Sequence, residues 1–173
     1  MQPNVLIYHA NQCDPKKCTG IRLSRMKHAT ILKTMKEIPH RSVVLNPVSE
    51  IAFSKVDREA LLHSGLVALD CSWKQAEDIF ANSKYGIQRA LPYLLAANPI
   101  NTYKPIKLST AEAIAAALYI VGFQEYARDV MSVFKWGPSF LILNQELLDA
   151  YFNCTSSTEV VAVQKEIMDS QTR

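Results

Sequence analysis

Four consecutive residues, Asp70-Cys71-Ser72-Trp73, place a carboxylate, a thiol, a hydroxyl and an indole directly after the apolar run Leu66–Leu69. A run of this kind is typical of a strand buried on both faces, and Gly65 before it indicates a turn. Because open α/β sheets bind their ligands at the carboxyl ends of parallel strands, the tetrapeptide is a candidate site. A buried helix N-terminus, with Asp70 or Ser72 as its cap and Trp73 in the core, explains the same residues.

Other common catalytic and nucleotide-binding motifs are absent from the sequence. The five glycines form neither a dinucleotide-binding nor a P-loop array, and there is no nucleophile elbow and no His-Glu-x-x-His pair. Cys71 would need a partner base, and His63 precedes the buried strand in a predicted helix. Cys13 and Cys18 lie near His9 but lack the second ligand pair of a typical metal site, so we expect no metal.

The pattern of apolar residues predicts strands that alternate with helices in the first half of the chain. Predicted strands cover 4–10, 42–45, 66–70 and 90–96, and predicted helices cover 24–36, 54–62 and 75–80. This alternation favours a parallel sheet with flanking helices. The capping box Ser109-Thr110-Ala111-Glu112 then opens a helix that ends at Gly122, and helices are predicted over 124–134, 139–152 and 158–169. We therefore expect an α/β domain over 1–92 and an all-helical domain over 93–173.

The composition indicates a globular protein with a basic N-terminal third. The chain has 173 residues, 49% of them hydrophobic, and four cysteines, which we expect to be free thiols. It contains no apolar run long enough for a membrane span and no signal peptide, which predicts a cytoplasmic protein. The net charge is +3, but residues 1–41 hold eight basic and two acidic side chains. Arg25, Lys33 and Lys36 fall on one side of the predicted helix, which suggests a surface for a polyanion.

Six segments together resemble one protein family, the small-subunit ribosomal RNA aminocarboxypropyltransferases in their short archaeal form. The resemblance spans residues 4 to 152. The matching segments are Asp14-Pro15-Lys16-Lys17-Cys18-Thr19-Gly20, Leu45-Asn46-Pro47 with Ser54-x-x-Asp57-Arg58, Asp70-Cys71-Ser72-Trp73, Arg89-x-Leu91-Pro92-x-Leu94-Leu95-Ala96-Ala97-Asn98-Pro99-x-Asn101, Lys104-Pro105-x-Lys107-Leu108-Ser109-x-x-Glu112-Ala113, and Trp136-Gly137-x-x-Phe140-x-x-x-Asn144. One departure is Asn101-Thr102-Tyr103, where relatives usually carry Asn-Tyr-Gly.

The resemblance implies a SPOUT-like α/β fold with a deep trefoil knot, although knots are too rare to be expected from sequence patterns. It also implies S-adenosylmethionine as group donor, bound in the cleft between the two domains. The implied reaction moves the 3-amino-3-carboxypropyl group to N3 of a (N1-methyl)pseudouridine in small-subunit rRNA and releases methylthioadenosine. A methyltransferase of similar fold and a non-catalytic rRNA-binding assembly factor are the alternatives. We expect a monomer that binds rRNA or a pre-ribosomal particle and does not bind a membrane.

The resemblance also assigns the site residues. The implied catalytic residues are Asp70 and Trp73. The implied cofactor-binding residues are Thr19, Leu45, Pro47, Leu69, Asp70, Trp73, Leu91, Leu94, Ile106, Leu108, Ser109 and Thr110, whereas Glu112 is interpreted as a helix cap. The expected phosphate contacts are Lys16, Lys17, Arg22, Arg25, Lys27, Arg58 and Arg89.

Transfer of the larger group makes specific demands on such a site. The methionine γ-carbon, rather than the methyl, must face the nucleophile at about 3–3.5 Å, in line with the departing sulfur. A rigid indole such as Trp73 can form the wall that pins the methionine chain, although a purely structural role remains open. Asp70 can accept the proton of the acceptor nitrogen or orient it, and an unshifted aspartate is a weak base for this N–H.

Overall fold

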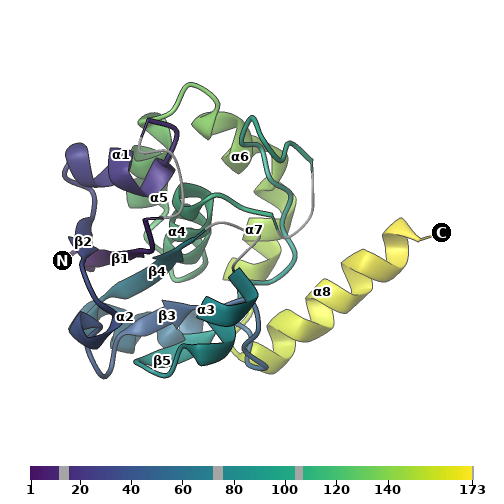
Figure 1. The fold of residues 1–173 in the computed structure, drawn as a ribbon. Coiled ribbons are helices and arrows are strands. Elements are labelled where there is room, and N and C mark those ends of the chain that lie inside the picture. The colour runs from purple at the N-terminus through teal and green to yellow at the C-terminus, as the bar shows by residue number, and fades with distance from the viewer. Residues whose placement is uncertain (12–15, 72–75, 104–106, 173) are drawn as a thin grey trace.

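The computed structural model describes residues 1–11, 16–71, 76–103 and 107–172. A five-stranded, wholly parallel sheet lies at its centre, in the order β2-β1-β4-β3-β5. Helices lie against both faces of the sheet, and the longest helix, α8, extends outward to the C-terminus (Figure 1). The strands are β1 (Val5–His9), β2 (Thr30–Leu32), β3 (Val43–Leu45), β4 (Leu66–Asp70) and β5 (Ile87–Arg89).

The helices of the first half are short, and those of the second half follow one another without intervening strands. The first group comprises α1 (Thr19–Arg25), η1 (Met35–Glu37), η2 (Lys55–Asp57), α2 (Arg58–Ser64) and α3 (Ala76–Asn82). The second group comprises α4 (Thr110–Ile120), α5 (Gln124–Ser132), α6 (Gly137–Leu143), α7 (Gln145–Phe152) and α8 (Ser157–Gln171). Within the described ranges, no helix is long and apolar enough to cross a membrane.

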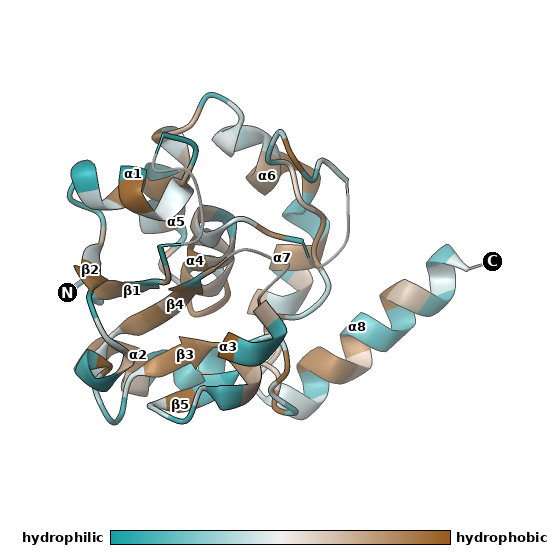
Figure 2. Ribbon diagram, in the orientation of Figure 1, coloured by the Kyte–Doolittle hydropathy of each residue, from teal (hydrophilic) through white to brown (hydrophobic). Residues whose placement is uncertain are grey.

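Strand β4 is buried along its whole length, as its apolar sequence predicts. Alternate residues serve two different core clusters: Leu66 and Ala68 face the first, Val67 and Leu69 the second. Figure 2 shows the apolar character of the central strands. By the same alternation, Asp70 at the end of β4 belongs to the face of Leu66 and Ala68.

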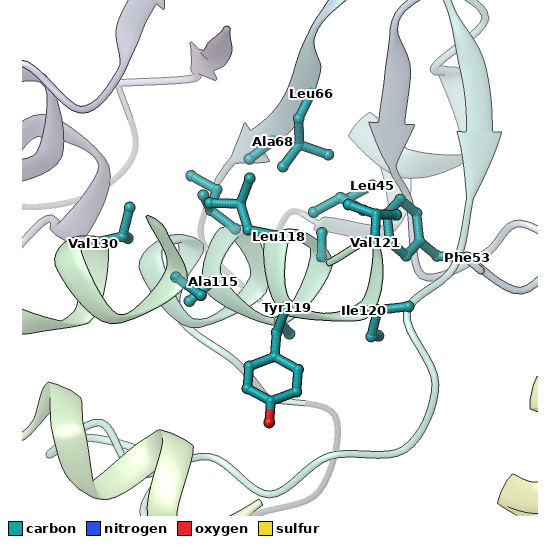
Figure 3. Close-up of a cluster of buried hydrophobic side chains, with 14 of the residues drawn as sticks. Leu45, Phe53, Leu66, Ala68, Ala115, Leu118, Tyr119, Ile120, Val121 and Val130 are labelled. Atoms are coloured by element: carbon teal, nitrogen blue, oxygen red, sulfur yellow. The ribbon is translucent and has the colours of Figure 1, made fainter. Parts of the chain in front are cut away.

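Helix α4 covers that face. Its capping box forms as predicted, because Ser109 accepts a hydrogen bond from the backbone N–H of Glu112 and Glu112 accepts one from that of Ser109. Alanines at 111, 115, 116 and 117 are fully buried, and such small side chains let the helix lie close to the sheet. Figure 3 shows Leu118 of this helix near Leu66 and Ala68 of β4. The resulting core joins the strands to the helices of the second half.

Three predicted elements are wrong. The predicted helix 24–36 is divided into the end of α1, strand β2 and η1, because residues 30–32 pair with Leu6–Tyr8 of β1. The charged stripe predicted for that helix therefore does not exist. The predicted strand 90–96 is only an isolated bridge at Ala90, after the short strand β5. The predicted helix 139–152 is interrupted at Asn144, whose side chain bonds to the backbone of Leu95 instead of facing solvent.

Candidate functional site

The carboxyl ends of β1 and β4 bring His9 and Asp70 together. These two residues are paired in the sheet register, and both are about nine-tenths buried. The starts of two helices close over them: Cys18 immediately precedes α1, and Thr110 is the first residue of α4. Four elements that are distant in sequence therefore converge on one carboxylate, at the edge of the sheet where ligands bind.

Hydrogen bonds fix the orientation of the Asp70 carboxylate. Thr110 Oγ1 donates to Oδ1 at 2.9 Å, and Cys18 Sγ donates to Oδ2 at 2.8 Å. The Nε2 atom of His9 lies 3.8 Å from Oδ2. Each carboxylate oxygen therefore has one uncharged donor, and the side chain is held in a single orientation.

The close approach of α1 to β4 depends on Gly20. A Cβ atom at this position would lie 2.7 Å from Asp70 Oδ2, so a larger residue would displace the carboxylate or the helix. Thr19 strengthens the same junction, since its hydroxyl accepts a hydrogen bond from the backbone N–H of Ala111 at 3.2 Å. The loop that the sequence singled out around Thr19 therefore belongs to the wall around Asp70.

His9, Cys18 and Asp70 also form the donor set that a metal ion would require. Their candidate ligand atoms all lie within 4.8 Å of one another. A structural zinc site takes four protein ligands, and in the part of the chain that the structure describes this group has three. Cys13, which the sequence places near Cys18, lies outside the described residues. The geometry can hold an ion, but a hydrogen bond already joins Cys18 to Asp70, and the other ring nitrogen of His9, Nδ1, lies 3.0 Å from Asn11 Oδ1.

A cavity of about 970 Å³ opens beside Asp70. This volume lies at the upper end of the range of pockets that enclose small organic ligands, about 300–1,000 Å³. The predicted cofactor residues that line it are Thr19, Leu45, Pro47, Leu69, Asp70, Leu91, Leu108, Ser109 and Thr110. Leu94 instead is fully buried in the main core and does not line the cavity. Trp73 and Ile106 lie outside the described residues.

Glu112 fixes one wall of the cavity from its buried side. It is fully buried, and its carboxylate accepts hydrogen bonds from the backbone N–H groups of Ala97, Asn98 and Ser109 and from the Asn98 amide. Asn98 in turn lines the cavity. The prediction that Glu112 is a helix cap is therefore confirmed, and the same carboxylate holds the loop after residue 96 against α4.

Sequence reasoning missed several residues that line the cavity. They are Asn46, Phe80, Asn98, Phe134, Trp136, Val161, Gln164 and Met168. Helix α8 reaches the cavity through Gln164, whose side-chain oxygen accepts a hydrogen bond from the backbone N–H of Tyr93 at 2.8 Å. Trp136 stands in one of the segments that carry the family resemblance, which was the available signal for it. Nothing in the sequence of α8 indicated that this helix lines a site.

The predicted basic residues fall into two groups. Lys16, Lys17 and Arg22 line the cavity, and Arg25 and Lys27 are exposed nearby at and beyond the end of α1. Arg58 instead donates a hydrogen bond to the Val121 carbonyl, and its guanidinium lies 4.2 Å from the centre of the Phe123 ring. Arg58 thus packs α2 against the helical half.

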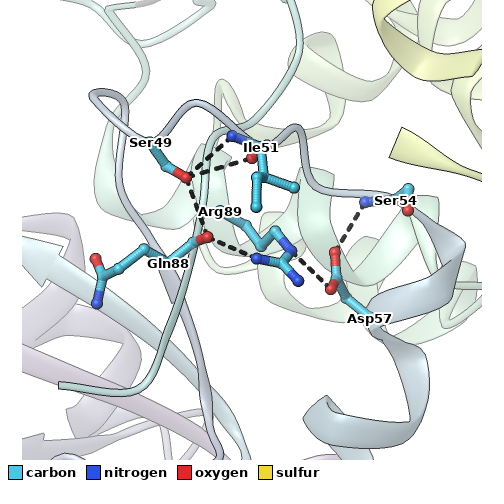
Figure 4. A network of polar contacts seen from close by, with 6 residues as sticks. All are labelled: Ser49, Ile51, Ser54, Asp57, Gln88 and Arg89. Atoms are coloured by element: carbon cyan, nitrogen blue, oxygen red, sulfur yellow. Dashed lines mark hydrogen bonds and ion pairs between the residues drawn. The ribbon is translucent and has the colours of Figure 1, made fainter. Parts of the chain in front are cut away.

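Arg89, the remaining predicted cation, belongs to a closed polar network. Its Nε atom donates to Asp57 Oδ1 at 2.9 Å, and the other oxygen of Asp57 accepts from the backbone N–H of Ser54 at 3.1 Å (Figure 4). The Ser49 hydroxyl donates to the Gln88 carbonyl at 3.0 Å and so ties the loop after β3 to β5. These contacts fix the loop between β3 and η2, and they account for the arginine without an external ligand.

Comparison with known proteins points to one family. A family profile described as "Ribosome biogenesis protein, C-terminal" matches residues 43–168. The chain is 48% identical to a 16S rRNA aminocarboxypropyltransferase of Methanocaldococcus jannaschii over 166 residues, 96% of each chain. It is 49% identical to the protein of the same name from Methanothermobacter thermautotrophicus over 167 residues, covering 95% of this chain and 98% of the relative.

The solved structure of an S-adenosylmethionine-dependent rRNA:acp-transferase from Vulcanisaeta distributa is similar along the whole chain. The TM-score is 0.87 at 38% identity, with 98% of each chain covered. This match corrects the predicted fold class: the parallel sheet with flanking helices stands, but the SPOUT-like class with a deep trefoil knot was wrong. That class came from the resemblance alone, and no strand pairing or packing in the sheet required it.

A second profile, described as a possible Fer4-like domain in RNase L inhibitor, matches residues 4–37. An iron–sulfur cluster of that type requires four cysteine ligands, and this stretch contains only Cys13 and Cys18. The residues of the segment that the structure describes form β1, α1, β2 and η1 of the α/β half. The match therefore describes part of the sheet and gives no support for a cluster.

Proposed function

Because the chain belongs to the family of the 16S rRNA aminocarboxypropyltransferases, we propose that it transfers the 3-amino-3-carboxypropyl group of S-adenosylmethionine to a small-subunit rRNA. The finer proposal is that the acceptor is N3 of a pseudouridine, N1-methylated or not. The single observation that carries the proposal, besides family membership, is a buried, oriented carboxylate at the edge of a ligand-sized cavity.

The residues present fit S-adenosylmethionine. Apolar walls from Leu45, Leu69 and Leu91 suit an adenosyl group, and hydroxyls from Ser109 and Thr110 suit its polar substituents. When bound, S-adenosylmethionine supplies the transferred group: its γ-carbon–sulfur bond breaks as a bond to nitrogen forms, and methylthioadenosine leaves. The protein must therefore hold the methionine chain with its γ-carbon toward the acceptor and its methyl turned away.

We assign the cofactor walls to Thr19, Leu45, Pro47, Leu69, Leu91, Leu108, Ser109 and Thr110, and we retain Trp73 and Ile106 as proposed contacts. Trp73 is the proposed flat wall against the sulfonium. Leu94 supports the wall from the core rather than touching the ligand. The domain assignment also stays a proposal: residues 1–92 carry the sheet, and residues 93–173 close the cofactor cleft.

Asp70 is the proposed catalytic residue. The acceptor N–H must lose its proton as the new bond forms, and the Asp70 carboxylate either accepts this proton or orients the N–H by a hydrogen bond. The donors from Cys18 and Thr110 leave each oxygen a further lone pair for the acceptor. Both roles require the same placement of the ring nitrogen, within hydrogen-bond reach of Asp70.

The RNA contacts that we propose are Lys16, Lys17, Arg22, Arg25 and Lys27, which would bind phosphates and position the substrate. Arg58 and Arg89 are omitted because internal contacts explain them. We further propose that the protein acts as a monomer in the cytoplasm. A methyltransferase and a non-catalytic assembly factor are not favoured, because the similar curated relatives are named as aminocarboxypropyltransferases.

The test of this function is nucleoside mass analysis of small-subunit rRNA after incubation with the protein and S-adenosylmethionine. We expect one pseudouridine to gain the mass of the aminocarboxypropyl group, with methylthioadenosine as co-product. The same rRNA with uridine in place of the pseudouridine is the control for the acceptor. Appearance of S-adenosylhomocysteine, or cofactor binding without any RNA product, would contradict the proposal.

A further inference from the structure

An aromatic pair lies in the wall of the cavity, between α5 and α6. The rings of Phe134 and Trp136 are stacked, with centres 5.0 Å apart and planes inclined by 28°. Phe134 is buried in the main core, Trp136 is half-buried, and both line the cavity. Phe134 thus anchors the pair, and Trp136 is the more accessible ring.

The same end of the cavity carries its basic side chains. Arg22 is exposed, and its guanidinium lies 5.6 Å from the centre of the Phe134 ring. Lys16 and Lys17, just before α1, line the cavity as well. In the described ranges, Arg22 forms no ion pair with a carboxylate. Aromatic faces next to cations are the combination by which proteins bind unpaired nucleotides.

This end of the cavity is close to the catalytic carboxylate. Cys18, which donates to Asp70, and Arg22 are joined by a backbone hydrogen bond at 3.2 Å, so they are one helical turn apart. One turn of α-helix is about 5.4 Å long, comparable to the width of a pyrimidine ring with its substituents. One turn of α1 therefore joins the two, with Cys18 at the Asp70 carboxylate and the guanidinium of Arg22 at the Phe134 ring.

We propose that Trp136, backed by Phe134 and flanked by Arg22, is the platform on which the acceptor pyrimidine stacks after it leaves its neighbours in the RNA. This inference rests on the proposed function. Stacking uses the faces of the base and leaves its edges free, so that N3–H can point to Asp70 while the platform fixes the plane of the ring.

The cofactor is the weaker candidate for this end of the cavity. Its proposed walls are the carboxyl ends of β3 and β4, the segment around Leu91 and the start of α4. The sulfonium of S-adenosylmethionine is itself a cation, so three further cations suit an RNA backbone better. Trp136 is therefore assigned to the acceptor.

The test compares the affinities of wild-type and variant protein for two RNA hairpins of small-subunit rRNA sequence. One carries a pseudouridine in its loop, and the other carries an abasic ribose at that position. We expect Trp136→Leu to weaken binding of the first hairpin about ten-fold and to change binding of the second by less than about two-fold. Trp136→Phe should restore most of the loss, because it keeps an aromatic face.

Two controls separate stacking from other effects. Phe123→Leu removes the ring of a second aromatic–arginine pair, formed with Arg58 away from the cavity, and should change binding of neither hairpin. Affinity for S-adenosylmethionine, measured by calorimetry, should be the same in Trp136→Leu and wild type. Equal losses on both hairpins, no loss on either, or a parallel loss of cofactor affinity would overturn the proposal. Since the comparison measures binding, a wild-type protein that binds but transfers nothing would refute only the proposed function.

Discussion

Asp57 and Asp70 are both buried carboxylates, but their surroundings differ. Asp57 is paired with the Arg89 guanidinium and accepts a backbone N–H from Ser54, so its charge is neutralised inside the fold (Figure 4). Asp70 is held by a thiol and a hydroxyl and borders a cavity. In the described part of the chain, no lysine or arginine forms an ion pair with it.

The difference separates a structural carboxylate from a functional one. A buried charge is costly unless it is paired, and Arg89 offsets that cost at Asp57. Cys18 and Thr110 orient Asp70 without a lysine or arginine as counter-charge in the described residues, and the imidazole of His9 lies 3.8 Å from Oδ2. Both residues are buried, so burial does not distinguish the structural carboxylate from the functional one. The identity of the hydrogen-bond donors and the cavity beside Asp70 make the distinction.

The largest expected effect is that of Asp70→Asn on the transfer reaction. We expect the single-turnover rate to fall at least about 100-fold, since proton transfer by a positioned side chain contributes about 10²–10⁴-fold. Affinity for S-adenosylmethionine should be retained in calorimetry, because the amide keeps the shape of the carboxylate. Transfer at the wild-type rate would remove Asp70 from the mechanism.

The reciprocal change, Asp57→Ala, should act on stability instead. Removing one partner leaves the Arg89 charge unpaired, and we expect the free energy of unfolding to fall by about 3 kcal/mol in urea titrations. At a temperature where the variant is folded, transfer per folded molecule should stay near wild type. If Asp57→Ala abolished transfer without destabilising the fold, the division between the two carboxylates would be wrong.

A smaller effect is expected from the donor to Asp70. Thr110→Val removes the hydroxyl and should lower kcat/KM about ten-fold, the loss expected for a hydrogen bond to a charged group. Thr110→Ser keeps the donor and is the matched control. Equal activity of the valine and serine variants would show that orientation by this hydroxyl is unimportant.

The smallest expected effect is that of metal removal. Because Cys18 and Thr110 account for the placement of Asp70, we expect incubation with a chelator to change transfer by less than about two-fold. Activity that is lost with the chelator and recovered with Zn²⁺ would instead identify His9, Cys18 and Asp70 as a metal site.

Local patterns in the sequence predicted the centre of the fold and the position of Asp70. The apolar run 66–69 and the capping box at Ser109 are strong local signals, and both elements form as predicted. The sequence pattern around residues 30–32 predicted a helix, because these residues form a strand only through their pairing with β1. The family resemblance supplied most of the cavity wall, but also the wrong fold class.

Local patterns could not predict that α8 lines the cavity, or that the rings of Phe134 and Trp136 stack. Both depend on how the second half of the chain folds back over the sheet, which no short motif encodes. The same holds for Arg58 and Arg89: their charge and their place in matching segments suggested RNA, whereas their contacts are internal. Residue type alone could not separate these arginines from Arg22.

The most direct test of the account follows two labels in one reaction. S-Adenosylmethionine labelled in its methyl group and, with a different isotope, in its carboxyl carbon is incubated with the wild-type protein and small-subunit rRNA, and both labels are counted in the RNA. We predict that the carboxyl label enters the RNA and that the methyl label is recovered in methylthioadenosine. Methyl label in the RNA, with the carboxyl label left in S-adenosylhomocysteine, would contradict the account.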